Sequence, residues 1–107
     1  MFDRDVLELL KNDVGVDVLA HLLNLFREEL EAQQNQLAKY PFQTSHNEVR
    51  DLLHILKNTS KLYGVTTLSK VAEELYQYDV IEPTDVVTLR SIILDTVAAL
   101  PTYQEVE

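Results

Sequence analysis

Apolar residues recur at intervals of three and four along most of the chain, which is the period of an amphipathic α-helix. This pattern predicts a short helix over residues 3–11 and longer helices over 17–39, 45–64, 66–78 and 83–100. No stretch alternates between apolar and polar residues as a half-buried β-strand would. We therefore predict an all-α fold in a single domain, residues 1–107: an antiparallel up-down four-helix bundle with a short additional N-terminal helix covering one end.

Several helix ends carry recognisable signals. Asp17 is a plausible N-cap for the second helix. Ser45 followed by Glu48 has the spacing of a capping box, in which each residue satisfies a free amide of the other. Gly64 suits the position just after the last turn of the third helix, and Pro83 suits the first turn of the fifth.

The third helix separates its side chains into two faces. At ~100° per residue, one face carries its apolar residues together with Ser60: Val49, Leu52, Leu53, Leu56, Ser60 and Tyr63. The other carries Arg50, His54, Lys57, Asn58 and Lys61. A histidine in this position is displayed to solvent with Lys57 and Lys61 within reach of anything attached to it. This is a suitable place for a negatively charged group and a poor one for a buried structural histidine.

Charge and composition narrow the function classes. The net charge is −9, which argues against nucleic-acid binding and against binding to an anionic membrane surface. The chain has no cysteine, which excludes disulfides and cysteine-based metal sites, and its three histidines share no metal-ligand spacing. The N-terminus lacks the pattern of a signal peptide, and no apolar run reaches the ~18 residues of a membrane span. A cytoplasmic protein is expected.

Two blocks of the sequence resemble the histidine-containing phosphotransfer (Hpt) domain. The first block is His54-x-Leu56-Lys57-x-x-Ser60-x-x-x-Gly64-x-x-x-Leu68. The second lies upstream and reads Val14-Gly15-x-Asp17-x-Leu19, then Leu22-Leu23-x-x-Phe26-x-x-Glu29. Two positions depart from the family pattern: Asn58 stands where a glycine is common, and Leu53 where a small residue is common. Asn58 is expected to affect the phosphate environment and partner fit.

The resemblance implies a phosphoryl carrier, not a self-sufficient enzyme. His54 would accept a phosphoryl group from the receiver domain of a hybrid sensor histidine kinase and pass it to the receiver domain of a response regulator. Lys57 would supply positive charge to the phosphoryl oxygens. An ordinary imidazole, with a pKa of ~6.5, is substantially neutral and nucleophilic at cell pH. The chain would bind no cofactor, and Mg²⁺ is expected in the partner receiver domain.

The expected partner surface surrounds His54 and consists of Arg50, Asp51, Ile55, Asn58, Lys61 and Leu62. Ile55 and Leu62 would either contact the receiver domain or pack against a neighbouring helix. Tyr76, Tyr78 and Phe42 are expected to complete the core or its edge.

The protein is expected to be a monomer. An alternative function is a helical adaptor that binds receiver domains or partner helices without carrying phosphate. A solvated surface histidine in an unrelated helical bundle is the less specific interpretation.

Overall fold

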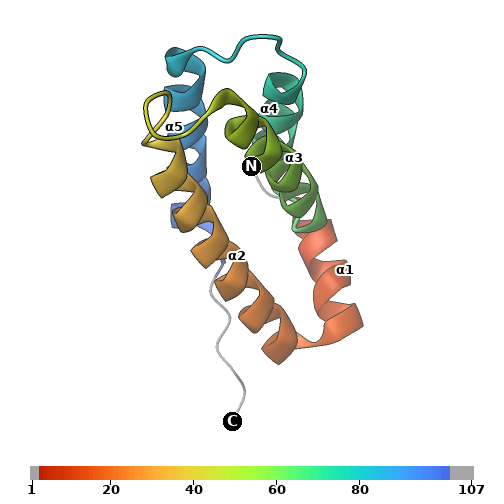
Figure 1. Cartoon of the computed structure of the whole chain (residues 1–107). Coiled ribbons are helices and arrows are strands. Elements are labelled where there is room, and N and C mark those ends of the chain that lie inside the picture. Colours follow the sequence, from red (N-terminus) through yellow and green to blue (C-terminus); the bar gives the residue numbers. More distant parts are fainter. Residues whose placement is uncertain (1–2, 102–107) are drawn as a thin grey trace.

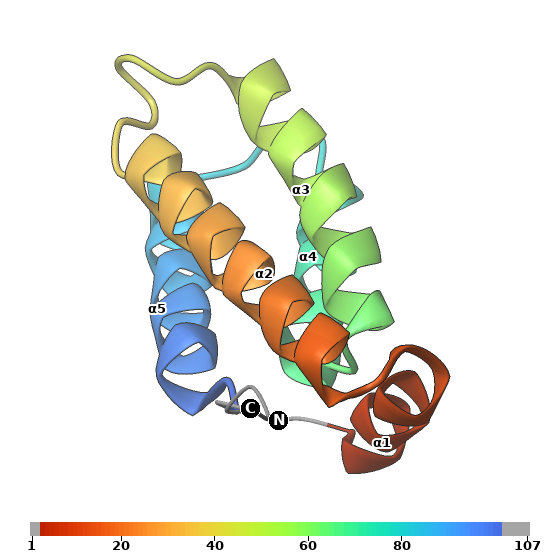
Figure 2. The ribbon, with the colours of Figure 1, turned by 90° about the horizontal axis from the view of Figure 1, so that it is seen from below.

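The computed structural model describes residues 3–101, which form five α-helices and no β-strand. The helices are α1 (Arg4–Val14), α2 (Val16–Leu37), α3 (His46–Leu62), α4 (Thr66–Tyr76) and α5 (Pro83–Ala99). In Figures 1 and 2, helices α2 to α5 lie side by side and successive helices run in opposite directions, while α1 lies at one end beside the turn from α3 to α4. The predicted all-α bundle with an additional N-terminal helix is confirmed.

The core is built from the apolar faces of all five helices. The predicted apolar face of α3 is confirmed, since all six of its residues are buried: Val49, Leu52, Leu53, Leu56, Ser60 and Tyr63. Phe26 of α2 stacks on the Tyr63 ring with ring centroids 4.7 Å apart. This burial fixes the rotation of α3 about its axis, and so determines which of its side chains face solvent.

The turn between α3 and α4 is a Schellman motif centred on Gly64. The amide of Gly64 donates to the Lys61 carbonyl at 3.2 Å and that of Val65 to the Ser60 carbonyl at 2.8 Å. Gly64 has a φ of +71°, as predicted for a residue just after a helix. The Asp3 amide donates to the Gly64 carbonyl at 2.7 Å, which ties the start of α1 to this turn.

Two predicted boundaries at the start of the chain are wrong. The first helix continues to Val14 instead of ending at Lys11, and α2 begins at Val16 with Gly15 as its N-cap in place of Asp17. Gly15 has φ 89° and ψ 161°, a conformation almost confined to glycine, and this allows α2 to start directly after α1. The Ser45 N-cap is confirmed, because its hydroxyl accepts from the Glu48 amide at 3.1 Å.

The aromatic residues predicted to complete the core behave differently from one another. Tyr76 packs partly against the core, as predicted. The prediction is wrong for Phe42, which is 93% exposed, and for Tyr78, which is 44% exposed. Both lie in loops, and the loop around Phe42 is held by its neighbours instead: the Tyr40 hydroxyl donates to the Ile81 carbonyl and the Thr44 hydroxyl to the Gln36 carbonyl.

Candidate functional site

His54 lies midway along α3 and is exposed, as predicted from its angle to the apolar face. The residues on either side of it, Leu53 and Ile55, point in different directions, since Leu53 is fully buried and Ile55 is 50% exposed. The backbone of α3 is therefore held firmly against the core while the imidazole projects into solvent. The position of His54 is confirmed, and its chemical role stays a prediction.

The ring of Tyr76, at the end of α4, lies beside His54. The two ring centroids are 5.7 Å apart and the planes are tilted by 41°. This contact arises because α3 and α4 form an antiparallel hairpin around Gly64, so that the middle of α3 meets the last turn of α4 (Figure 2). The sequence indicated Tyr76 only as a residue of the core edge, and its place beside His54 was missed.

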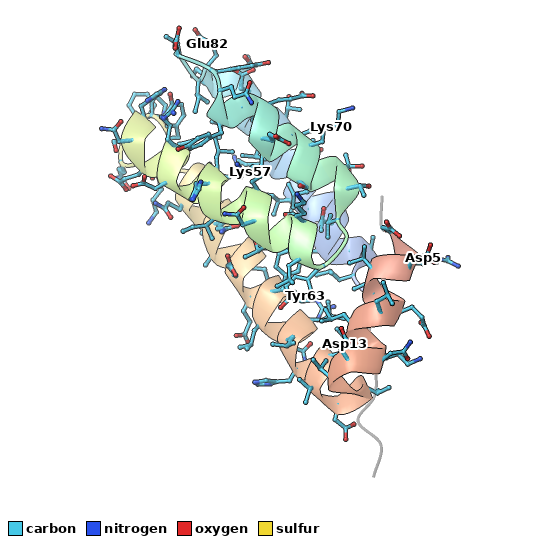
Figure 3. The ribbon with its side chains drawn as sticks, turned by 90° about the vertical axis from the view of Figure 1, so that its right-hand side faces the viewer. Asp5, Asp13, Lys57, Tyr63, Lys70 and Glu82 are labelled. Carbon is cyan, nitrogen blue, oxygen red and sulfur yellow. The ribbon has the colours of Figure 1, made fainter. Side chains whose placement is uncertain are left out.

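Two cations also contact the Tyr76 ring. The Arg50 guanidinium carbon lies 4.6 Å from the ring centroid, and the Lys57 Nζ lies 5.6 Å from it. Both distances are within the range of cation–π attraction. Figure 3 shows Lys57 midway along α3, on the side where α3 adjoins α4. Arg50 also donates a hydrogen bond from Nη1 to the Tyr78 carbonyl at 3.1 Å.

Neither cation of this site forms an ion pair with an acid in the part of the chain that the structure describes. Within residues 3–101, neither Arg50 nor Lys57 has a carboxylate within ion-pair distance. In a chain of net charge −9, this leaves two cations flanking an exposed imidazole. Such a group of side chains can bind an anion with several oxygens, such as a phosphoryl group, through charge-assisted hydrogen bonds.

The remaining predicted partner residues spread over the rest of α3. Asp51 and Ile55 line a groove on the side of α3 that faces α2, together with Gln33 and Glu48. Lys61 lies towards α1, in a hollow lined also by Gly64, Lys70 and Glu73, and so apart from the Tyr76 ring. Asn58 is exposed, next to Lys57. The structure therefore brings together Arg50, His54 and Lys57, and places Asp51 and Lys61 on either side of them.

Ile55 and Leu62 are half exposed, at 50% and 56%. About half of each side chain is thus left uncovered by the neighbouring helices, which favours the alternative in which they contact a partner. They present apolar surface on α3, the element that carries the imidazole, Ile55 next to His54 and Leu62 just over two turns beyond it. Exposed apolar side chains of this kind are available for contact with another protein.

The groups with shifted pKa values belong to the packing of α2 on α3. Burial raises the pKa of the Glu29 carboxyl, and a hydrogen bond from the Gln33 amide, 3.2 Å long, partly offsets this. Burial also raises the pKa of the Tyr63 hydroxyl, and the neighbouring Glu29 carboxylate raises it further. These shifts report on the α2–α3 interface, away from the Tyr76 ring.

The described residues offer neither a metal site nor a membrane span. Among residues 3–101, no group of three or more histidine or acidic side chains is placed to hold a metal ion. Over the same range, no helix is both long and apolar enough to cross a membrane.

Comparison with protein families gives one match. The family model described as "Hpt domain" matches residues 21–100, about three quarters of the 107 residues. The matched segment contains His54, Lys57 and Tyr76 as well as most of α2 and all of α3 and α4. No curated protein and no solved structure matches the chain significantly.

Proposed function

Because the chain belongs to the Hpt domain family, whose members carry phosphoryl groups in phosphorelays, we propose that His54 is its phosphoacceptor. The observation that carries the proposal is the exposed imidazole at the centre of α3, with Lys57 and Arg50 beside it and no carboxylate paired with either cation within residues 3–101. Hpt domains interact with receiver domains, so the donor and the acceptor are both receiver aspartates.

The proposed transfer needs few groups from this chain. One ring nitrogen of neutral His54 attacks the phosphorus of the aspartyl phosphate. The new nitrogen–phosphorus bond forms as the bond to the carboxylate oxygen breaks, and the aspartate leaves as a carboxylate. The other ring nitrogen keeps its proton, so the imidazole becomes cationic as the phosphoryl group arrives. Lys57 and Arg50 stabilise the charge on the three phosphoryl oxygens.

The partners follow from this chemistry. The donor is the receiver domain of a hybrid sensor histidine kinase, and the acceptor is the receiver domain of a response regulator. Mg²⁺ is supplied by the receiver domain, whose aspartyl phosphate it neutralises. Ile55 and Leu62 provide apolar contact to the receiver, while Asp51, Asn58 and Lys61 lie where its rim would rest. The protein acts as a monomeric carrier in the cytoplasm.

The test is a transfer assay with a radiolabelled phosphorylated receiver domain. The expected product is phosphate on this chain that is labile in acid and stable in base, as a phosphoramidate bond is. His54→Gln removes the label, whereas His21→Gln, a matched change at an exposed histidine of α2, leaves it unchanged. Circular dichroism establishes that both variants fold.

The result that would overturn the proposal is equally specific. If wild type binds receiver domains but acquires no label from any receiver of its organism, and His54→Gln binds them equally well, the chain is a non-phosphorylated adaptor. Full labelling of His54→Gln would instead place the acceptor elsewhere.

A further inference from the structure

Within residues 3–101, the Tyr76 ring is the group that contacts His54 and both neighbouring cations, Arg50 and Lys57. We infer that Tyr76 is a positioning residue for phosphotransfer, whose ring holds Arg50 and Lys57 on either side of His54 along α3. This makes Arg50 the second cation for the phosphoryl group, beside Lys57. The inference rests on the proposed function of His54.

The spacing of the three residues makes them a single row. Arg50 lies four residues before His54 and Lys57 three residues after it, so all three occupy one face of α3 at intervals of one turn. Their side chains approach the same ring at 4.6, 5.7 and 5.6 Å. A bulky ring shared by three flexible side chains limits the directions that each can take, and so reduces the entropy lost when an anion binds.

Arg50 is anchored twice, by the last residue of α4 and by the loop that follows it. Its guanidinium lies over the Tyr76 ring and donates to the Tyr78 carbonyl. That hydrogen bond uses one of five N–H groups, so the others remain able to bind phosphoryl oxygens in the two-pronged geometry that arginine favours. The end of α4 and the loop after it thus fix the position of the Arg50 guanidinium while leaving several of its N–H donors available.

An aromatic ring is suited to this task because it carries no net charge. A carboxylate in the same place would orient the two cations equally well, but it would neutralise them and repel the phosphoryl group. The ring orients them through its quadrupole and leaves their charge available. This explains why Arg50 and Lys57 stay in place with no carboxylate partner within the described part of the chain.

Two substitutions separate the ring from the hydroxyl. Tyr76→Phe keeps the ring, whereas Tyr76→Leu removes it and keeps an apolar side chain against the core. Proton NMR of the His54 imidazole, assigned with His54→Gln, reports the ring contact directly. Transfer from a phosphorylated receiver domain is measured over a range of receiver concentrations. This gives two separate quantities: the transfer rate at saturation and the receiver concentration at which the rate is half of that value.

For Tyr76→Leu we expect His54 proton shifts that differ from wild type and a saturated transfer rate about tenfold lower, as the loss of two cation–π contacts at an exposed site would give. The half-saturating receiver concentration should change less than the rate. For Tyr76→Phe we expect shifts close to wild type and a rate within about twofold. Arg50→Gln should lower the saturated transfer rate. In the Arg50→Gln background, Tyr76→Leu should lower that rate by a smaller factor than it does in wild type.

Unchanged His54 shifts in Tyr76→Leu overturn the inference, as does a normal saturated rate in that variant. An equal loss in Tyr76→Phe also overturns it, because the hydroxyl would then be the active group. If wild type accepts no phosphate at all, the proposed function fails and any role of Tyr76 in transfer fails with it. If His54-dependent labelling proceeds equally in wild type and Tyr76→Leu, only the role of Tyr76 is refuted.

Discussion

Replacing Gly64 by alanine perturbs the turn that sets the alignment of α3 with α4. Two costs follow from the structure. At φ +71° an L-residue with a Cβ is disfavoured by about 1–2 kcal/mol. The added Cβ would also lie 2.9 Å from the Asp3 carbonyl oxygen and 3.0 Å from the Val6 Cβ. Asp3 offers a backbone atom there, so the contact is relieved only if the start of α1 moves.

The size of the effect can be worked out from these contacts. Moving α1 weakens the Asp3–Gly64 hydrogen bond, worth about 1 kcal/mol, and loosens the packing of Val6 at a similar cost. The reduced freedom of the unfolded chain returns about 0.4–1 kcal/mol. We therefore expect Gly64→Ala to lower the free energy of unfolding by roughly 2–3.5 kcal/mol, from these terms together.

The assay is urea unfolding followed by circular dichroism, with amide hydrogen exchange to locate the change. Gly15→Ala is the control, because its φ is also positive but nothing lies within 4 Å of the added Cβ. Both variants should be destabilised, but only Gly64→Ala should lose protection of the Asp3 amide. A destabilisation below about 1 kcal/mol with the Asp3 amide still protected would refute the reasoning about close contact.

Three further predictions concern other positions. Ser60→Ala should be as stable as wild type or up to about 1 kcal/mol more stable in urea unfolding, because the Ser60 Oγ is buried and has no hydrogen-bond partner among residues 3–101; a clear loss would contradict this. Glu29→Gln should be more stable than wild type at pH 7, because burial raises the pKa of Glu29 and so disfavours its charged form in the folded state. This difference should vanish as the pH falls below the unfolded-state pKa of ~4.3, where Glu29 is protonated in both states, and a difference that persists there would count against the explanation. Ile55→Ser should weaken binding to a receiver domain about fivefold or more by calorimetry, whereas Leu94→Ser, at a similarly exposed residue of α5, should leave it unchanged; equal effects would exclude Ile55 from the interface.

The sequence was sufficient for the helices and for the side of α3 that His54 occupies. Both follow from the period of about 3.6 residues in the apolar positions. A residue on the side of a helix opposite its apolar face points to solvent, whatever that face packs against. The start of α2 could not be predicted in the same way. Asp17 has the chemistry of an N-cap, but the connection from α1 is so tight that Gly15, with its unusual backbone angles, occupies that position.

Tyr76 was missed because its contact joins two helices. The rotation angle of one helix does not say which residues of the next lie opposite. The predicted turn at Gly64 does carry this information. A tight turn brings together residues that are equally far from it on either side, and His54 and Tyr76 are each about ten residues from Gly64. The prediction that Phe42 completes the core fails for a different reason. It rests on the apolar character of the side chain alone, whereas Phe42 lies in a loop that holds it away from the core.

The hairpin of α3 and α4 has a consequence for how such a protein can diversify. The residues around the Tyr76 ring all come from residues 50–78, one continuous stretch of chain closed by a single turn. Helices α1, α2 and α5 contribute burial and none of these contacts. Substitutions that keep their apolar faces can therefore accumulate in three helices while the contacts of the Tyr76 ring stay constant. A one-residue insertion within α3, between Arg50 and Lys57, would rotate one cation about 100° away from the ring and dismantle the site at once.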